Sequence, residues 1–484
     1  MKIIAYNPQK SKHISIESSN DQFGGKSSGS DSTKHDTSSS EGGSLPAFSP
    51  STIFYESAAS KYYIDVGTHF RVYSQKAPVV RGVASLLMAE DVPKTKDERD
   101  DLLARAAGMV GDIEIEQAVD WAGGIAGHKK GLTHFNNFTA LITDEPKLIL
   151  PLSGSFPVIE EILRQGLGEG IQMTTWLGWL SIALKAVIAG KHQPGQLVAL
   201  AGKKNTGKSL LCQVAARILG GRVGDPYAAW TNSIVWNDDL IRAELLVIDD
   251  SVSSTDPRAR RALAARFKEA IYSGQVQLRK RHSSSLCVRP VWRVIICCND
   301  NPEALQIIPP IDEDLSDKIT LLRVNKITPP VDTSSPEGRD RFWELIEAEL
   351  PAFVAHLLEF KIPSDLKDTR AGILAYRDVE LEKAVLELAP EKRLEEMLIR
   401  MFETGHFNLS PGESGKFTAS DLQSRMTDSE SSVCTQARNL FNSWPAACGV
   451  YLGKLSRHRP DMVEQCGKSQ NIQKWKITRP AEKG

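Results

Sequence analysis

The chain has 484 residues, of which 41% are hydrophobic and 25% charged, and its formal net charge is −1. This length exceeds what one hydrophobic core supports, so we expect a globular protein of about two to four domains. The near-zero charge excludes a uniformly basic nucleic-acid-binding surface, and the seven cysteines, without any C-x-x-C pair, argue against structural zinc.

Residues 1–50 are rich in serine, glycine, aspartate and lysine. Such a segment buries too little apolar surface to offset the entropy lost on ordering, so disorder is predicted. In 52–74, aromatic and β-branched residues around an Asp-Val-Gly-Thr turn predict a hairpin. The segment 95–125 is predicted to be mostly helical, and 174–189 predicts a helix that ends at Gly190.

No membrane-spanning or secretory segment is predicted. Met1 is followed by no apolar signal-peptide core, and the most apolar stretch, 176–190, is short and interrupted by Lys185. Cys297 and Cys298 lie in an apolar run and are interpreted as buried thiols of a reducing compartment. We therefore expect a cytoplasmic protein of a bacterial or host cell, not secreted and without a membrane partner.

From Gln196 to Lys326, short apolar runs alternate with helical segments. The runs LVALA, LLVIDD and VWRVIICCN are typical of parallel strands that are covered on both faces. This part of the sequence therefore predicts an α/β nucleotide-binding core.

The stretch 197–219, LVALAGKKNTGKSLLCQVAARIL, contains the pattern G-x-x-x-x-G-K-[ST] between a predicted strand and a predicted helix. Its glycines let backbone N–H groups close around phosphate oxygens at the positive end of the helix. Lys208 is expected to neutralise the β- and γ-phosphates of ATP, and the Ser209 hydroxyl to bind Mg²⁺. The predicted nucleotide-binding residues are Gly202, Lys203, Lys204, Asn205, Thr206, Gly207, Lys208 and Ser209.

Two further strand ends carry polar side chains. Asp249 is expected to hold Mg²⁺ through water and Asp250 to polarise the attacking water, although a turn or a helix cap would also explain an Asp pair. Asn299 follows the next strand, where its amide would orient water beside the γ-phosphate. The sequence NDNP would also suit a simple turn.

Together, GKKNTGKS, LLVIDD and VWRVIICCNDNP resemble motifs A, B and C of superfamily 3 helicases, most of all those of the primase–helicases of phages, plasmids and large DNA viruses. Asn205 and Asn299 match asparagines of motifs A and C in that family. The resemblance spans residues 55–326 and, more weakly, the tail. It implies an AAA+-like ATPase that uses ATP and Mg²⁺, forms a homo-hexamer and translocates on single-stranded DNA.

The family carries a β-hairpin between motifs B and C whose tip contacts DNA in the central pore. The segment SGQVQLRKRHSSSLCVRPVWRV has the same place and form, with Val276 and Leu278 in one arm and Leu286 and Val288 in the other. Cations near such a turn bind DNA phosphates independently of the base sequence. The alternative interpretation is a basic loop that contacts only solvent. The implied DNA-binding residues are Lys280, Arg281 and His282.

In the family, the next subunit supplies an arginine finger shortly after motif C, and this sequence has no arginine at the expected position. The matching position holds Lys318, and a lysine supplies charge without the bidentate fork of a guanidinium. Either Lys318 substitutes, or Arg323, Arg293 or an arginine of 258–261 serves instead.

The tail has the size of a small helix–hairpin domain. FTASDLQSRM and SESSVCTQARNLFNSW predict helices, and GKLSRHRP with IQKWKI predicts two strands around a basic turn. This order resembles the winged-helix domain of many replicative helicases of this group. It implies a cationic patch for duplex phosphates, although a solvated basic tail, or packing against the ring without DNA contact, would also explain it. The implied residues include Lys454, Arg457 and Arg459.

The predicted α/β architecture has five parts: a disordered arm (1–50), a small N-terminal α+β domain (51–170), an AAA+-like core (171–330), a helical linker (331–389) and a winged-helix-like domain (390–484). The N-terminal part leaves little room for a polymerase, so a primase or polymerase is expected to be a separate protein. The first hypothesis is an ATP-dependent helicase that acts on single-stranded and forked DNA in replication of a mobile element or virus. The alternatives are an ATPase switch that remodels a protein partner or defence complex, and a non-unwinding origin-binding initiator that uses ATP for assembly.

Overall fold

The structure is a computed structural model, and it describes residues 49–481 except 136, 250–256, 280–284, 310, 312–314, 442–443, 445 and 470–471. The predicted disordered arm lies outside this part of the chain, apart from its last two residues.

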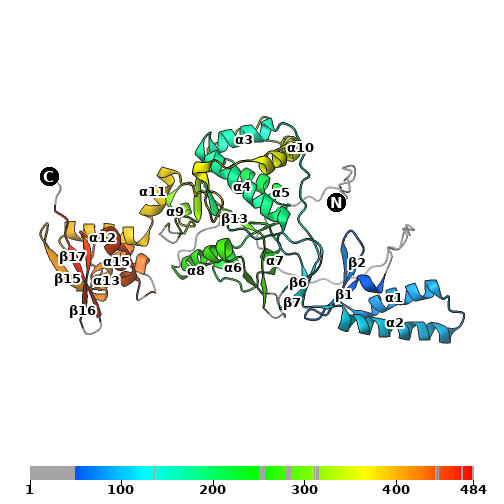
Figure 1. The fold of residues 1–484 in the computed structure, drawn as a ribbon. Coiled ribbons are helices and arrows are strands. Elements are labelled where there is room, and N and C mark those ends of the chain that lie inside the picture. The colour runs from blue at the N-terminus through cyan, green and yellow to red at the C-terminus, as the bar shows by residue number, and fades with distance from the viewer. Residues whose placement is uncertain are drawn as a thin grey trace, which may run out of the picture. The chain divides into compact units, whose positions relative to one another are not determined.

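A five-stranded sheet forms the centre of the nucleotide-binding part, in the order β14–β8–β13–β10–β9 (Figure 1). All of its neighbouring strands are parallel, which confirms the predicted α/β class and the three apolar strands. Because β13 lies between β8 and β10, the strand that leads to Asn299 runs between those that lead to Gly202 and to Asp249. The strands are β8 (Leu197–Ala201), β9 (Val223–Gly224), β10 (Leu245–Asp249), β13 (Arg293–Cys298) and β14 (Ile319–Arg323).

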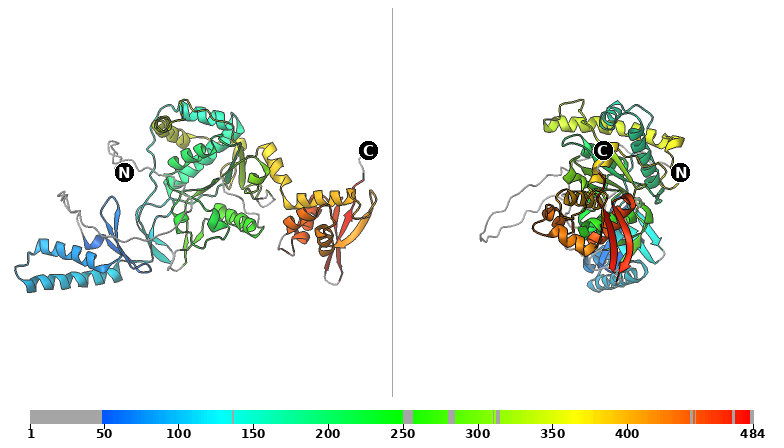
Figure 2. Two further views of the ribbon diagram at one scale, coloured as in Figure 1. Left: turned by 180° about the vertical axis from the view of Figure 1, so that it is seen from behind. Right: turned by 90° about the vertical axis from the view of Figure 1, so that its left-hand side faces the viewer.

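Helices cover both faces of this sheet, and the two views in Figure 2 agree with this layering. Along β8, Val198 and Leu200 point into one core, whereas Leu197, Ala199 and Ala201 point into the other. This alternation explains why the strand is apolar throughout. The first face carries α3 (Pro157–Leu167), α4 (Ile171–Ala189), α5 (Lys208–Ile218) and α10 (Pro336–Glu359); the second carries α6 (Tyr227–Trp230), α7 (Asp238–Ile241) and α8 (Pro257–Lys268), with the short α9 (Pro302–Leu305) following β13.

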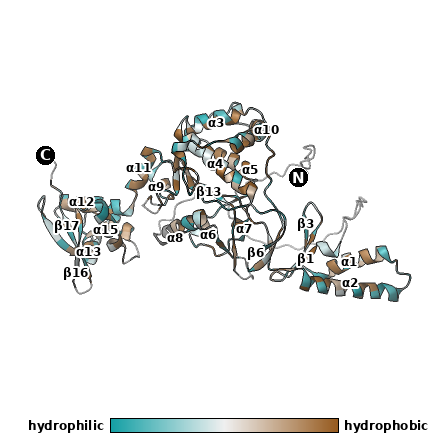
Figure 3. Ribbon diagram, viewed as in Figure 1, coloured by the Kyte–Doolittle hydropathy of each residue, from teal (hydrophilic) through white to brown (hydrophobic). Residues whose placement is uncertain are grey.

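Helix α4 is the one described helix that is long and apolar enough to cross a membrane by length and composition, but 67% of its apolar window is buried inside the protein. Its hydrophobic residues are brown in Figure 3. Trp176 and Trp179 stack with ring centroids 5.4 Å apart. The helix ends at Gly190, in a left-handed conformation with φ 59°, as predicted. Its burial is that of a core helix.

A four-stranded sheet, in the order β3–β2–β1–β4, and two helices form the N-terminal part. The predicted hairpin is confirmed, and Thr95 and Glu98 form a capping box at the start of the long helix. The segment 95–125 is mostly helical, as predicted; its helix runs from Lys96 to Glu116, and strands follow, because Val119 and Trp121 alternate inward. The elements are β1 (Ile53–Glu56), β2 (Lys61–Asp65), β3 (Phe70–Tyr73), α1 (Lys76–Glu90), α2 (Lys96–Glu116) and β4 (Ala118–Val119).

A small sheet follows, formed by β5 (Trp121–Gly123), β6 (Gly131–Phe135) and β7 (Phe138–Ile142). Backbone hydrogen bonds join the β5–β6 connection to the core: Ala126 N–H donates to Ile241 O at 2.8 Å, and Val291 N–H donates to Ala126 O at 2.9 Å. Trp121, Phe138 and other apolar side chains of this sheet pack in the same cluster as α7 and α8. The small sheet is thereby held on the nucleotide-binding part.

The C-terminal part packs helices against a three-stranded sheet in the order β15–β17–β16. The segment 379–405 forms two helices, because Pro390 begins the second and disfavours helix in the residue before it. The elements are α11 (Val379–Glu387), α12 (Pro390–Glu403), β15 (Ser414–Thr418), α13 (Ala419–Thr427), α14 (Cys434–Phe441), α15 (Ala447–His458), β16 (Val463–Ser469) and β17 (Ile472–Thr478).

The prediction that GKLSRHRP forms a strand is wrong. Residues up to His458 belong to α15, because Cys448, Tyr451, Leu452 and Leu455 recur at helical spacing and are buried. The predicted strand IQKWKI is confirmed as β17, and the two other predicted helices are confirmed as α13 and α14.

Candidate nucleotide-binding site

The loop 202–207 joins the buried end of β8 to the start of α5. Asn205 and Gly207 adopt left-handed conformations, with φ 63° and 102°. A Cβ at Gly202 would lie 2.3 Å from Val324 O, and one at Gly207 would lie 2.6 Å from Ile327 Cδ1. The loop therefore needs glycine at both ends, because it packs directly against the chain that follows β14.

Lys208 is the first residue of α5, and its side chain turns back over the loop. It is 7% exposed. Its Nζ donates to the carbonyl oxygens of Gly202 and Lys203, both at 2.9 Å, and lies 3.4 Å from Asn299 Oδ1. The ammonium is thus held at the centre of the loop, in contact with the amide that follows β13, whereas Lys203 and Lys204 are exposed.

Two side-chain oxygens meet at the next residue of α5. Ser209 Oγ donates to Asp249 Oδ2 at 3.1 Å, so the second residue of α5 meets the last residue of β10. A cavity of about 320 Å³ lies against both side chains. Hydroxyl and carboxylate oxygens are the donors that Mg²⁺ takes in nucleotide sites, so this pair fits that ion.

The sheet explains why these residues meet. The carboxyl ends of β8, β13 and β10 are neighbours at one edge, and Lys208, Asn299 and Asp249 follow or end those strands. The structure therefore brings together Lys208, Ser209, Asp249 and Asn299 of the predicted set. Asp250, predicted to polarise water, lies outside the described residues.

Two thiols face each other between α5 and β13. Cys212 Sγ on α5 and Cys297 Sγ on β13 are 3.1 Å apart, and both side chains are buried. The hydrogen bond with Cys212 and burial raise the pKa of the Cys297 thiol well above its usual value. The interpretation of Cys297 and Cys298 as buried thiols is confirmed, at 1% and 3% exposure.

The candidates for the finger differ in their surroundings. Lys318 Nζ lies 2.8 Å from Asp317 Oδ1 and 5.1 Å from the centroid of the Tyr272 ring. Arg323 is held by Asp378 at 2.8 Å and Glu380 at 3.1 Å. Arg293 is 5% exposed, so the proposal that it reaches a neighbouring subunit is wrong. The side chains of the arginines in 258–261 lie outside the described residues.

Arg370 is a cation that sequence reasoning missed. Its guanidinium lies 3.9 Å from the centroid of the same Tyr272 ring, and the side chain is exposed. It lies far from Lys318 in sequence, so no local motif could have indicated that the two share one ring.

The predicted hairpin is confirmed as β11 (Val276–Leu278) paired with β12 (Leu286–Val288). The strands are antiparallel, with Val276 opposite Val288 and Leu278 opposite Leu286. Leu278 and Val288 are buried in the core, which fixes the hairpin on the body of the protein. The predicted DNA contacts Lys280, Arg281 and His282 lie outside the described residues.

An exposed aromatic side chain beside this hairpin was also missed. Trp236 is 43% exposed and belongs to an apolar run in which Ile234 and Val235 are exposed too. Its neighbour Asn237 binds the hairpin through its side chain, donating to Gln277 O at 2.8 Å and accepting from Arg279 N–H at 2.7 Å. The run SIVW gave no signal, because by composition alone it suggests a buried strand.

The predicted cations of the tail have different partners. Arg459 binds Asp461 through two nitrogens, at 2.9 and 2.8 Å, and also contacts Glu395. Lys454 Nζ lies 3.9 Å from Glu391 Oε1. Arg457 is exposed near the end of α15.

A scan against protein-family models and a search of curated proteins gave no match. Among solved structures, the chain is similar to the apo structure of the NrS-1 C-terminal region, with TM-score 0.50 and 13% identity over 88% of this chain and 95% of that one. An A-form apo structure of the same region gives TM-score 0.49 and 12% identity over 88% and 96%. The active helicase Cch of SCCmec type IV gives TM-score 0.40 and 10% identity over 88% and 92%. At TM-score 0.50, the first similarity shows a shared fold.

Replacing Asp249 by asparagine tests the oxygen pair. The change keeps the shape but removes the charge that favours a divalent cation, so ATP hydrolysis is expected to fall by about 100-fold with nucleotide binding retained. The measurement is the hydrolysis rate as a function of Mg²⁺ concentration. Asp225→Asn, which removes the same charge from the same cavity, is the control, and equal losses in both variants would refute the special role of Asp249.

Proposed function

We propose that the chain is an ATP-dependent DNA helicase of a mobile element or virus. The observation that carries the proposal is the convergence of four side chains at the carboxyl ends of parallel strands: Lys208, Ser209, Asp249 and Asn299. The hairpin directly precedes β13, one of these strands. The similarity in fold to the NrS-1 C-terminal region supports the architecture.

Each residue of the site has a separate role in ATP hydrolysis. Loop N–H groups and Lys208 bind the phosphates, and Ser209 and Asp249 would hold Mg²⁺, which neutralises charge on the β- and γ-phosphates when bound. Asn299 contacts Lys208 and orients water next to the γ-phosphate. Asp250 follows β10 and polarises that water.

Hydrolysis and the hairpin are coupled through one strand. Asn299 follows the last residue of β13, and β12, an arm of the hairpin, precedes the first residue of β13 by only a few positions. Because β13 is buried and paired with both β8 and β10, it connects the nucleotide site to the hairpin without a break in the sheet. A change in the contact between Asn299 and the γ-phosphate thereby shifts the hairpin. Movement of the hairpin then moves the bound DNA strand.

The remaining features of the proposal concern assembly. Six copies form a ring, in which Lys318, which lies against the same tyrosine ring as Arg370, acts on the ATP of the adjacent subunit. The part from α12 to β17 serves as a winged-helix-like domain that contacts duplex phosphates through Arg457. The protein works in the cytoplasm on single-stranded and forked DNA, with a separate primase or polymerase.

Removal of the hairpin charges separates this function from a protein-remodelling ATPase. The triple change Lys280→Ala, Arg281→Ala and His282→Ala is expected to lower stimulation of ATP hydrolysis by single-stranded DNA at least about tenfold, with basal hydrolysis retained, because phosphate contacts provide most non-specific affinity. Lys96→Ala, Arg99→Ala and Arg105→Ala, which remove three cations from α2, are the control. Basal hydrolysis that single-stranded DNA never stimulates in the wild type would favour the remodelling ATPase.

A further inference from the structure

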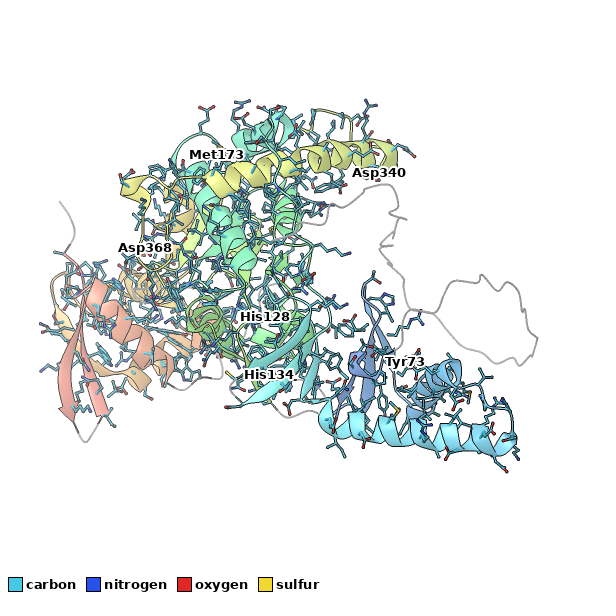
Figure 4. The ribbon with its side chains drawn as sticks, turned by 45° about the vertical axis from the view of Figure 1, so that its right-hand side comes forward. Tyr73, His128, His134, Met173, Asp340 and Asp368 are labelled. Atoms are coloured by element: carbon cyan, nitrogen blue, oxygen red, sulfur yellow. The ribbon has the colours of Figure 1, made fainter. Side chains whose placement is uncertain are left out.

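A groove of about 590 Å³ lies between the β6–β7 and β11–β12 hairpins. Its volume is within the range of about 300–1,000 Å³ typical of small-ligand sites. His134, Phe135 and Asn137 line one wall, and Gln277, Cys287 and Arg289 line the other. Figure 4 labels His134 on β6, the strand that contributes to the first wall.

The walls are held in place by the core. On the β11–β12 side, Leu278 and Val288 are 1% and 0% exposed, so the alternate residues Gln277 and Cys287, which are paired across the hairpin, point away from the core. On the β6–β7 side, Phe135 stacks on Phe138 with ring centroids 4.6 Å apart. The groove is therefore largely preformed.

One contact ties the two walls together. His128, in the connection that leads to β6, has its Nε2 3.1 Å from Arg289 O, and its ring lies 5.6 Å from that of Phe135. Burial lowers the pKa of His128, which favours the neutral imidazole.

The chemistry of the two walls is complementary to a nucleobase. The β6–β7 wall offers the ring of Phe135 and the imidazole of His134, and bases stack on such rings. The other offers an amide, a thiol and a guanidinium, and the described lining contains no carboxylate. Arg289 is oriented by Gln275: with the amide oxygen facing the guanidinium, that oxygen accepts from Nη2 at 2.7 Å and from Nε at 3.2 Å. Because this partner is a neutral amide and not a carboxylate, the positive charge of the guanidinium is not neutralised and can attract a phosphate.

We propose that this groove binds unpaired bases of a single nucleic-acid strand, so that the strand runs along the flank of the β11–β12 hairpin as well as over its tip. The proposal rests on the proposed function and adds a second contact surface to it. Bases stack on the Phe135 side, Gln277 bonds to their edges, and Arg289 binds the adjoining phosphate.

Cys287 provides a probe inside the groove. It is exposed, whereas Cys212, Cys297, Cys298 and Cys448 are buried. The full chain is treated with a maleimide with and without a saturating oligothymidylate, and modification of Cys287 is followed by mass spectrometry. The strand is expected to slow modification of Cys287 about tenfold or more and to leave Cys434, on α14, unchanged.

A double variant gives an independent measurement. His134→Ala with Gln277→Ala is expected to weaken oligothymidylate binding about tenfold, because stacking contributes about 1–3 kcal/mol per base. His69→Ala with Gln75→Ala, an exposed pair of the same residue types, is the control and should bind as the wild type does.

The other outcomes overturn the proposal in distinguishable ways. If the oligonucleotide binds but Cys287 reacts at an unchanged rate, the groove is not the site and the helicase proposal stands. If Cys287 is protected by self-association without DNA, a second copy of the chain fills the groove. If the chain binds no oligonucleotide at all, both proposals fail.

Discussion

Replacement of Lys208 by alanine is expected to lower ATP hydrolysis by about 100-fold to 1,000-fold, the loss typical of removing one preorganised charge-stabilising group. Lys208 Nζ lies within 2.9 Å of two loop carbonyl oxygens and contacts Asn299, so it is preorganised where phosphate charge would develop. The measurement is the steady-state rate of phosphate release at saturating ATP.

The same loop offers the matched controls. Lys203 and Lys204 belong to the predicted site through their backbone N–H groups, whereas their side chains are exposed, so Lys203→Ala and Lys204→Ala remove a cation and keep those groups. Each is expected to change the rate by no more than about threefold. A Lys208→Ala protein that hydrolyses ATP at the wild-type rate would contradict the assignment of the site.

Glu244→Ala is expected to destabilise the folded core by about 3–5 kcal/mol, the range measured when one partner of a buried ion pair is removed. Glu244 is 0% exposed and accepts hydrogen bonds from Arg222 Nε at 2.9 Å and from Gly127 N–H at 2.8 Å. Its removal leaves the largely buried Arg222 with the more exposed Asp144 as its remaining carboxylate partner. The measurement is the free energy of unfolding in urea.

Arg242→Ala is the control for that change. Arg242 also approaches Asp144, at 3.6 Å, but its side chain is 55% exposed. An exposed pair contributes at most about 1 kcal/mol, so a small effect is expected. Equal losses in the two variants would show that burial of the Glu244 ion pair is not what stabilises the junction between the small sheet and the core.

Sequence reasoning worked best where a pattern is local. The segment 197–219 encodes a buried strand, a turn with left-handed positions and an amphipathic helix in consecutive residues, and these elements occur as predicted. The Thr95 cap and the Gly190 stop are equally local. The edge at which Asp249 and Asn299 approach Lys208 follows once the strands are parallel and adjacent.

It failed where contacts join distant segments. Arg370 and Lys318 meet on Tyr272, and the hairpin β6–β7 faces β11–β12, across separations that no local pattern covers. In the tail, Tyr451, Leu452 and Leu455 have helical spacing, but the cations that follow them favour a strand by composition, so the prediction for GKLSRHRP is wrong. The exposure of Trp236 was not predicted either, because the apolar residues around it indicate a buried segment.

Strand displacement on a forked DNA duplex, with the wild-type chain compared with Lys208→Ala, tests the central proposal most directly. The account predicts that the wild type separates the strands only with ATP and Mg²⁺, and that the variant does not separate them. Intact ATP hydrolysis by the wild type without any displacement, and without stimulation by single-stranded DNA, would contradict it.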